Sequence, residues 1–281
     1  MEYHETHAIS HDLKIPKIIY GTAWKKDKTA SLVSKAIELG FRGLDTACQP
    51  KHYFEPGVGK ALSDLKKMGF ARDEIFLQTK YTPYPGQDPK NVPYDPSSGL
   101  RDQVLQSFSV SLKNLGTDYL DSLVLHSPLN TFDRTIEVWN AMEEIHERSG
   151  AKVLGISNCY DLNTLKSLYE TVSVKPTILQ NRFYQETDFD KDIRKWCLEK
   201  NIVYQSFWTL SANQVLLANN DFQSIANQYT KTAPQILFRF LTQIGVAPLT
   251  GTTSETHMQE DLSIFDFELS SKHLNQIHGL L

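Results

Sequence analysis

Apolar runs and helical periodicity alternate along the whole of this 281-residue chain. Short runs rich in β-branched and aromatic residues are followed by longer segments in which apolar residues recur every three or four positions. The runs that we predict to be strands cover residues 15–21, 41–47, 74–81, 119–126, 152–158, 177–183, 202–208 and 246–252. Because apolar strands that alternate with helices form parallel sheets covered on both faces, the pattern predicts an α/β fold.

The segments between these strands include predicted helices over residues 29–40, 101–116, 132–148, 161–172 and 232–245. Several end in or near glycine, which readily adopts the left-handed conformation that terminates a helix. Eight βα units in a chain of this length predict a (β/α)8 TIM barrel, with residues 1–281 in one domain. An open dinucleotide-binding sheet would carry G-x-G-x-x-G after its first strand, and the chain has no such sequence there.

The segment 81–99 is rich in proline, glycine and asparagine and is too long for a tight βα connection. We expect it to form a functional loop over the mouth of the barrel, because the loops at the carboxyl ends of barrel strands carry the chemistry of this fold.

Composition and charge exclude several classes of protein. With 29 Lys and Arg against 33 Asp and Glu, the net charge is −4, which does not fit a basic nucleic-acid binder. No apolar stretch is long enough for a spanning helix, and the polar N-terminus lacks a secretory signal, so we expect no membrane partner and a cytoplasmic location. Three well-separated cysteines, Cys48, Cys159 and Cys197, suggest neither disulfides nor a structural metal site.

Polar residues stand at the carboxyl ends of five predicted strands. They are Asp45, Lys80, His126, the pair Ser157 and Asn158, and the pair Gln180 and Asn181. Each one alone fits a helix cap or a loop residue, but five strands with such ends favour a site at the mouth. A tyrosine there could act as a general acid if a nearby lysine lowered its pKa and Asp45 kept that lysine charged.

These residues lie within longer strings that resemble the aldo-keto reductase family. The strings are GFRGLDTA, EPGVGKAL, LQTKY, DYLDSLVLHSP, KVLGISN and the pair Gln180-Asn181, in the family's order over nearly the whole chain. The chain looks like a short, fungal-type member similar to carbonyl and polyketone reductases. The resemblance implies a (β/α)8 barrel and the reversible reduction of aldehydes and ketones by a nicotinamide cofactor, without a metal.

The family's catalytic tetrad of Asp, Tyr, Lys and His maps onto Asp45, Tyr53, Lys80 and His126. Tyr53 needs an argument, because the family's usual spacing points to Pro50 and the segment CQPKHYFEPG is about two residues longer than the usual form. Tyr53 is the tyrosine of that segment, so we take it as the acid. His52 is the alternative proton donor.

The resemblance also places a cofactor site. Gly21, Thr22 and Ala23 would contact cofactor and substrate through the backbone, and Ser157, Asn158 and Gln180 would hold the nicotinamide carboxamide. Gln205 stands where most members have an aromatic residue stacked on the nicotinamide, so Phe207 or Trp208 could supply the stacking instead. Ser206, Phe207 and Thr209 would form the pyrophosphate loop.

The eighth predicted strand departs from the family pattern for the adenosine 2′-phosphate. Leu249 and His257 stand where a Lys and an Arg are usual, which removes the charge-assisted partners of a phosphate. Thr250, Gly251, Thr252 and Thr253 could still donate hydrogen bonds, although this segment also reads as a helix cap, and Glu260 and Asp261 match the pair that holds the adenine. We expect NADPH, with NADH as the alternative cofactor.

The predicted substrate pocket consists of Trp24, Tyr81, Ser127 and Trp208, each of which is also compatible with simple packing. An aromatic wall with few charges favours apolar or conjugated small-molecule carbonyl compounds. Larger members of the family close the pocket with a long tail, and none follows the final FDFELSSKHLNQIHGLL, so we expect an open mouth. Two alternatives remain: a non-catalytic nicotinamide sensor on the same fold, and a Schiff-base aldolase with Lys80 as nucleophile, which Asp45 would oppose by favouring the ammonium.

Overall fold

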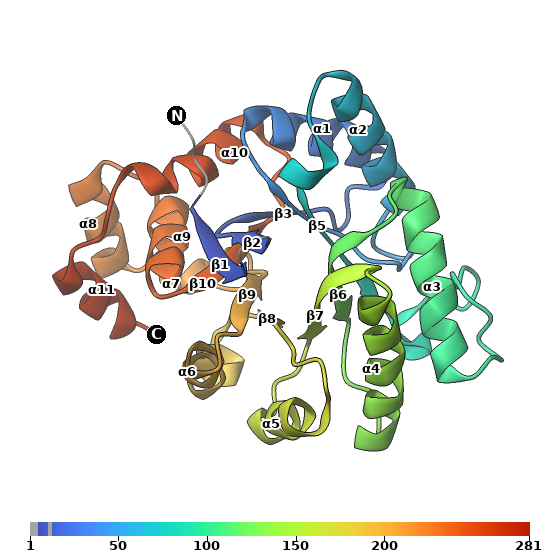
Figure 1. The fold of residues 1–281 in the computed structure, drawn as a ribbon. Coiled ribbons are helices and arrows are strands. Elements are labelled where there is room, and N and C mark those ends of the chain that lie inside the picture. The colour runs from blue at the N-terminus through green and yellow to red at the C-terminus, as the bar shows by residue number, and fades with distance from the viewer. Residues whose placement is uncertain (1–4, 11–12) are drawn as a thin grey trace.

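The computed structural model describes residues 5–10 and 13–281, and its centre is a closed barrel of eight parallel strands (Figure 1). Each strand pairs with the next along the chain, and the last pairs with the first. The barrel strands are β3 (Ile19–Gly21), β4 (Gly43–Asp45), β5 (Phe76–Tyr81), β6 (Leu120–Leu125), β7 (Ala151–Ser157), β8 (Ile178–Arg182), β9 (Val203–Phe207) and β10 (Val246–Thr250). Seven lie within a predicted range and β7 begins one residue before its own, at Ala151, so the prediction of a TIM barrel is confirmed.

Helices surround the barrel on its outside (Figure 1). They are α1 (Thr29–Leu39), α2 (Glu55–Lys67), α3 (Leu100–Leu115), α4 (Phe132–Glu147), α5 (Leu162–Thr171), α6 (Lys191–Glu199), α7 (Gln214–Leu217), α8 (Asn220–Tyr229), α9 (Ala233–Gln243), α10 (Glu255–Leu262) and α11 (Ser271–His278). Short 3₁₀ turns are η1 (Lys26–Lys28), η2 (Arg72–Glu74), η3 (Tyr84–Gly86), η4 (Gln185–Asp190) and η5 (Ser263–Asp266). Within the described residues, no helix combines the length and the apolar character that crossing a membrane requires.

The predicted helices are present to within one or two residues at each end, and side chains explain where several begin. Asp161 accepts hydrogen bonds from the backbone of the first turn of α5, and Thr232 forms a reciprocal capping box with Gln235 at α9. Gly116, with φ 65°, ends α3 in the left-handed conformation.

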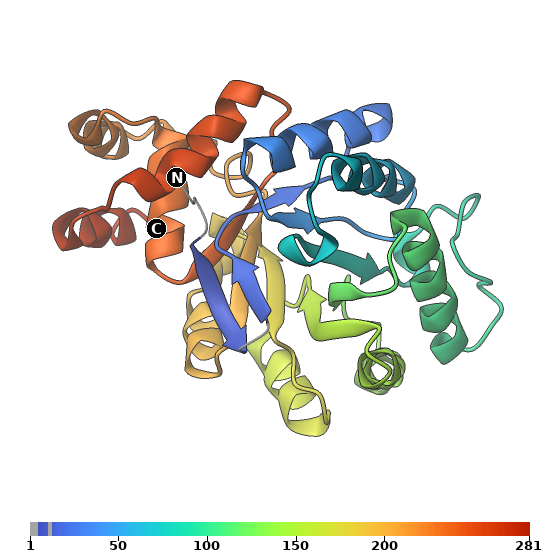
Figure 2. The ribbon, with the colours of Figure 1, turned by 45° about the horizontal axis from the view of Figure 1, so that its top comes forward.

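An antiparallel hairpin that the sequence analysis did not anticipate closes the other end of the barrel (Figure 2). Its strands are β1 (Thr6–Ser10) and β2 (Leu13–Pro16), so the predicted range 15–21 contains the end of β2 as well as β3. Leu13 and Ile15 of β2 pack in one apolar cluster with Phe76 and Val203, which lie at the starts of barrel strands. The amino-terminal end of the barrel is therefore filled by apolar side chains, and the site lies at the carboxyl end.

A buried carboxylate fixes the helix that follows the Tyr53 segment. Glu55, at the start of α2, accepts hydrogen bonds from Thr79 of β5 (2.7 Å), from Ser111 of α3 (2.8 Å) and from Asn114 of α3 (3.1 Å). Gly59 lets α2 approach α3, because a Cβ there would lie 2.0 Å from the Asn114 carbonyl oxygen. These contacts anchor the chain two residues after Tyr53.

The segment 81–99 does not cover the mouth as we expected. None of residues 82–99 lines the cavity described below; the segment passes instead along the flank of the molecule next to α3 (Figure 1). Gln87 donates to the carbonyl oxygens of Cys48 (2.9 Å) and Thr82 (3.1 Å), and Gln49 donates to that of Gly86 (2.7 Å). The segment therefore braces the loop between β4 and α2, which carries Tyr53.

Candidate active site

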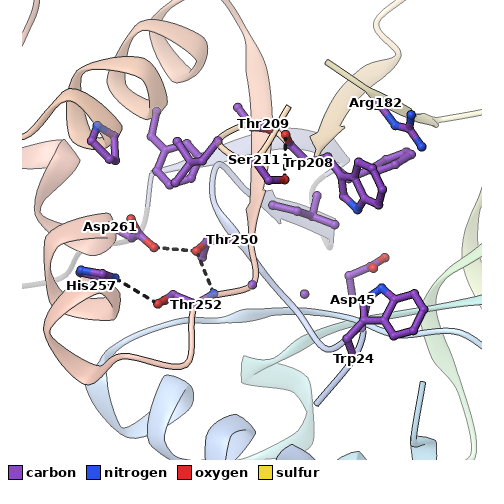
Figure 3. Close-up of a pocket in the computed structure, with 18 of the residues that line it drawn as sticks. Trp24, Asp45, Arg182, Trp208, Thr209, Ser211, Thr250, Thr252, His257 and Asp261 are labelled. Carbon is purple, nitrogen blue, oxygen red and sulfur yellow. Dashed lines mark hydrogen bonds between the residues drawn. The ribbon is translucent and has the colours of Figure 1, made fainter. Parts of the chain in front are cut away.

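A cavity of about 1350 Å³ lies at the carboxyl ends of the barrel strands. It exceeds the roughly 300–1,000 Å³ of a typical small-molecule pocket, which leaves room for an extended ligand and a second, smaller one. Its lining residues form two groups. The tetrad end contains Trp24, Asp45, Arg182 and Trp208, which Figure 3 labels, together with Tyr53 and His126. The threonine end contains Thr250, Thr252, His257 and Asp261, also labelled there, together with Thr253.

A fully buried ion pair forms the floor of the tetrad end. Lys80 donates to both carboxylate oxygens of Asp45, at 2.6 and 2.7 Å, and to the carbonyl oxygen of Thr46, at 2.9 Å. All three donors of the ammonium are therefore in use. Burial lowers the pKa of Lys80, and the charge of Asp45 opposes that shift. Lys80 does not itself line the cavity, so it acts on the site through its neighbours.

Three glutamine side chains surround Asp45 in the layer below. Gln78 and Gln180 each donate to Asp45 Oδ1, at 2.7 and 3.0 Å, and both also donate to Gln205 Oε1, at 2.8 Å. Gln205 returns a bond of 3.2 Å to Gln78. This network joins β4, β5, β8 and β9 and leaves the carboxylate of Asp45 little freedom to rotate.

Tyr53 lies between Lys80 and His126. The centre of its ring is 5.3 Å from Lys80 Nζ and 6.0 Å from the centre of the His126 ring. We expected Lys80 to lower the pKa of Tyr53, but burial raises that pKa and Asp45 adds to the effect. The physical reason is that a phenolate in this enclosed position loses its solvation, and the nearby Asp45 carboxylate repels its charge. His52, the alternative donor, also lines the cavity, with its ring 4.0 Å from that of Trp24.

His126 is held through one ring nitrogen. Its Nδ1 lies 2.6 Å from the hydroxyl oxygen of Thr82, and its backbone carbonyl accepts a hydrogen bond of 2.8 Å from Asn158. Burial, with the positive charge of Lys80, lowers the pKa of His126 to about 3, so the ring is neutral at ordinary pH. When the Thr82 hydroxyl donates to Nδ1, Nε2 carries the proton and becomes a donor.

Ser157, Asn158 and Gln180 stand next to one another, as the resemblance implied, and all three line the cavity. The Ser157 hydroxyl donates to the Gln180 carbonyl at 2.6 Å, and Asn158 Nδ2 also donates to the Ser157 hydroxyl at 3.2 Å. Both amide hydrogens of Gln180 point into the glutamine network. Its Oε1 is therefore the atom left to accept a hydrogen bond from a ligand.

Gln205 does not occupy a stacking position at the cavity. It is fully buried in the network under Asp45, whereas Phe207 and Trp208, just beyond it, line the cavity. Trp208 has φ 55° and Trp24 has φ 64°, a left-handed conformation that is strained for such side chains. Both side chains are more than half exposed, so their apolar faces are available to a ligand.

The segment predicted as a pyrophosphate loop forms a compact turn after β9. Thr209 donates to the Ser206 hydroxyl at 2.9 Å, and Asn213 donates to the Thr209 carbonyl at 2.8 Å. Thr209 and Phe207 line the cavity, but Ser206 is buried behind it.

At the threonine end the side-chain pairs are local, and Tyr20 of β3 donates to the Thr252 carbonyl oxygen at 2.8 Å. The Thr250 hydroxyl donates to Asp261 at 2.6 Å, and Thr252 Oγ1 lies 3.5 Å from His257 Nδ1 (Figure 3). Burial raises the pKa of Asp261 to about 7. Ser254 caps α10, and Thr253 and His257, on either side of the first residues of that helix, line the cavity, so its amino-terminal end borders this part of it. Gly251, Thr253 and Glu260 complete the predicted lining.

Sequence reasoning missed two cationic side chains of the cavity, Lys25 and Arg182. Lys25 comes from the loop after β3, is largely buried, and donates to the carbonyl oxygen of Gly251, 226 residues away in the chain. Burial lowers its pKa. Arg182 is the last residue of β8 and follows Gln180 by two positions, a spacing that could have indicated the same inward face.

Two of the four predicted substrate residues lie elsewhere. Tyr81 follows Lys80 on β5 and therefore points outward, where its hydroxyl contacts Gln103 of α3 at 3.3 Å. Ser127 does not line the cavity either, whereas Trp24 and Trp208 do.

Among the predicted backbone contacts, Gly21 and Ala23 line the cavity. Thr22 is fully buried, and its hydroxyl donates to the backbone carbonyl oxygen of Asp45.

Comparison with known proteins agrees with this architecture. A glyoxal reductase of Bacillus subtilis is 29% identical over 248 residues, which cover 88% of this chain and 82% of the relative. The crystal structure of an aldo/keto reductase from Brucella melitensis superposes with a TM-score of 0.83 at 28% identity, over 99% of this chain and all of that one. An aldo-keto reductase of Bombyx mori, solved in complex with NADP, gives 0.78 at 25% identity, over 95% and 89%. The model of the aldo/keto reductase family matches residues 17–281, and the chain therefore belongs to this family of oxidoreductases.

Proposed function

We propose that the protein reduces aldehydes and ketones to alcohols with NADPH, with NADH as the alternative cofactor and Tyr53 as the proton donor. The observation that carries the proposal is the Asp45–Lys80 ion pair under the Tyr53 and His126 rings, at the floor of a cavity large enough for a dinucleotide and a small carbonyl compound.

In this proposal a bound nicotinamide supplies the hydride to the carbonyl carbon. The raised pKa of Tyr53 keeps its hydroxyl protonated until negative charge develops on the substrate oxygen, to which it then gives its proton. The Lys80 ammonium stabilises the phenolate that remains, and Asp45 keeps Lys80 charged. Neutral His126 donates a hydrogen bond to the carbonyl oxygen through Nε2 and orients it.

The residues present fit a nicotinamide dinucleotide. Gln180 Oε1 would accept from the carboxamide, and the faces of Phe207 or Trp208 would supply the stacking that Gln205 does not. Thr250, Thr252 and Thr253, the start of α10 and Lys25 would meet the phosphates of the other half. Lys25 supplies a positive charge that the sequence of the eighth strand lacks. The relative solved with NADP supports this assignment.

The structure of the tetrad end disfavours the aldolase alternative. A Schiff base needs a neutral lysine that can reach a carbonyl carbon. Lys80 donates three hydrogen bonds and is buried beneath the cavity lining. Borohydride with a carbonyl substrate should therefore trap no covalent Lys80 adduct.

For the substrate class we propose small aldehydes, α-keto esters and dicarbonyl compounds, consistent with the glyoxal reductase among the relatives. The narrower resemblance to short fungal carbonyl and polyketone reductases stays a prediction, as does the cytoplasmic location.

The test is a panel of carbonyl substrates assayed with NADPH and with NADH, for wild type and Tyr53→Phe. We expect Tyr53→Phe to lower kcat by roughly 10²–10⁴-fold while the Kd of NADPH changes less than about threefold. His52→Gln is the matched variant and should retain most activity. Activity retained by Tyr53→Phe but lost by His52→Gln would move the proton donor to His52. Tight NADPH binding without turnover of any carbonyl would favour the sensor, and a large NADH preference would overturn the choice of NADPH.

A further inference from the structure

Arg182 lies in the layer of side chains directly above the glutamine network. In a strand, residues two apart point to the same face, about 7 Å apart along the chain. Gln180 points into the barrel, where it bonds Asp45, so Arg182 points the same way but nearer the mouth. It lines the cavity, and Figure 3 shows it beside Trp208 at the tetrad end.

Aromatic faces hold the Arg182 guanidinium. Its central carbon lies 4.2 Å from the centre of the Trp208 ring and 5.0 Å from that of the Tyr184 ring. Such contacts favour a cation but do not use its N–H donors, which lie in the plane of the group. Within the described part of the chain, no carboxylate or carbonyl oxygen accepts from this guanidinium, and its Nε is buried without a partner.

The two lysines nearby, Lys80 beneath the cavity lining and Lys25 within it, differ in this respect. Lys80 is neutralised by Asp45, and Lys25 donates to the Gly251 carbonyl. A guanidinium that is fixed in place with its donors unused provides a site for an anion, and a planar fork of donors matches a carboxylate especially well.

We infer that Arg182 binds the carboxylate of the substrate, so that the preferred substrates are carbonyl compounds that also carry a carboxylate, such as 2-oxo acids. This inference rests on the proposed function. With the carboxylate at Arg182, the carbonyl group lies toward Tyr53 and His126, and the exposed faces of Trp24 and Trp208 enclose the organic part between them. An ester of the same acid keeps the carbonyl but loses the charge.

The experiment compares phenylglyoxylate with its methyl ester, using wild type, Arg182→Gln and Arg182→Lys. We expect Arg182→Gln to raise the KM for phenylglyoxylate by roughly 10–100-fold, as for the loss of a charged hydrogen-bonded pair, with less than about threefold change for the ester. Arg182→Lys should recover part of the loss, because it keeps the charge without the fork. Arg148→Gln removes an exposed arginine at the end of α4 and is the matched control.

Two binding measurements accompany the kinetics. Calorimetric titration with sodium benzoate should show binding to wild type and at least tenfold weaker binding to Arg182→Gln, and the Kd of NADPH should stay unchanged. If Arg182→Gln raises the Kd of NADPH tenfold and raises the KM for the acid and for the ester equally, Arg182 holds a cofactor phosphate and the inference is wrong. An unchanged KM for phenylglyoxylate would also overturn it.

The same measurements separate this inference from the proposed function. If wild type reduces the ester but neither reduces the acid nor binds benzoate, the carboxylate site is wrong and carbonyl reduction stands. If wild type reduces neither compound, the proposed function fails for this class, and the benzoate titration alone decides whether Arg182 is an anion site: loss of binding in Arg182→Gln supports it and equal binding refutes it.

Discussion

The two ends of the cavity are built in different ways. At the tetrad end, hydrogen bonds join residues far apart in the chain: Gln180 and Asp45 are separated by 135 positions, and Gln78 and Gln205 by 127. At the threonine end, the Thr250–Asp261 contact spans 11 positions and the Thr252–His257 contact spans 5. The tetrad end is therefore fixed by side-chain bonds between barrel strands. At the threonine end the side-chain pairs are local, and the long-range bonds, from Tyr20 and Lys25, go to the Thr252 and Gly251 backbone carbonyl oxygens.

Because the two ends are built differently, proton transfer and the choice of cofactor depend on different parts of the structure. Proton transfer needs groups held to a fraction of an ångström, which buried bonds between strands provide. A loop whose side chains bond locally, and whose long-range bonds use its backbone carbonyl oxygens, can change its phosphate donors without disturbing the barrel. Variants at the two ends should accordingly differ in what they affect: stability and kcat at the tetrad end, and cofactor affinity at the threonine end.

Lys80→Met should show the largest effect. It leaves the Asp45 carboxylate buried without its cation, which typically costs about 3–5 kcal/mol. Urea unfolding should show this loss of folding free energy, and a separate activity assay should show the loss of carbonyl reduction. Lys60→Met breaks an exposed pair with Asp64 and should cost at most about 1 kcal/mol. Similar losses in both variants would mean that the tetrad end is no more rigid than the surface.

The neutral state of His126 predicts a dependence of stability on pH. Its pKa is lowered to about 3 in the folded chain, whereas an unfolded histidine takes up a proton near pH 6.5. Its contribution to stability is therefore complete above pH 6.5 and is lost as the pH falls toward 3, by roughly 3 kcal/mol between pH 6.5 and 4.

Urea unfolding of wild type and His126→Gln at these two pH values measures that contribution, and the variant should lose less stability on acidification. His7, whose pKa burial lowers to about 4, contributes in the same direction, so His7→Gln is the comparison at the closed end of the barrel. Parallel pH curves for wild type and His126→Gln would contradict a neutral, enclosed His126.

Gln205→Leu tests the glutamine network and should have a smaller effect. It removes the acceptor shared by Gln78 and Gln180 and leaves buried amide hydrogens without partners, at a cost of about 1–3 kcal/mol. We also expect a lower kcat, because Asp45 loses part of its support. Gln228→Leu, on the exposed face of α8, should change the free energy of unfolding by no more than about 0.5 kcal/mol. Equal values for the two variants would show that the network does not fix Asp45.

The tetrad end could be predicted because the position of a residue at the end of a strand determines where it lies in a barrel of parallel strands. Asp45, Lys80 and His126 each stand at the end of an apolar run, and parallel strands bring their carboxyl ends to one mouth. Tyr53 depended on the family resemblance, because it lies in a loop whose length departs from the usual form. The direction of its pKa shift could not be predicted, since it depends on how completely the fold buries the ring and on where the Asp45 carboxylate lies.

Other features were not predictable because they depend on packing between distant segments. The β1–β2 hairpin has too few residues for a clear pattern, and its role is visible only when its side chains meet the barrel floor. Gln205 lies on the inward face of β9, but its hydrogen-bond partners, Gln78 and Gln180, come from β5 and β8. The segment 81–99 has the composition of a functional loop, yet Gln87 bonds it to the Cys48 carbonyl oxygen in the loop after β4, and Tyr94 donates to the Thr82 carbonyl oxygen within the segment.

Lys25→Met tests the threonine end and should have the smallest effect on the molecule as a whole. Lys25 reaches Gly251 from the loop after β3 and supplies the positive charge that Leu249 and His257 do not. If it faces the 2′-phosphate, its loss should raise the Kd of NADPH by about tenfold, that of NADH much less, and leave stability and kcat nearly unchanged. Fluorescence titration of both cofactors measures this, with the exposed neighbour Lys26→Met as control. An equal rise for the two cofactors would place Lys25 at the pyrophosphate that both share, and selectivity for NADPH would then depend on the threonine hydroxyls and the start of α10.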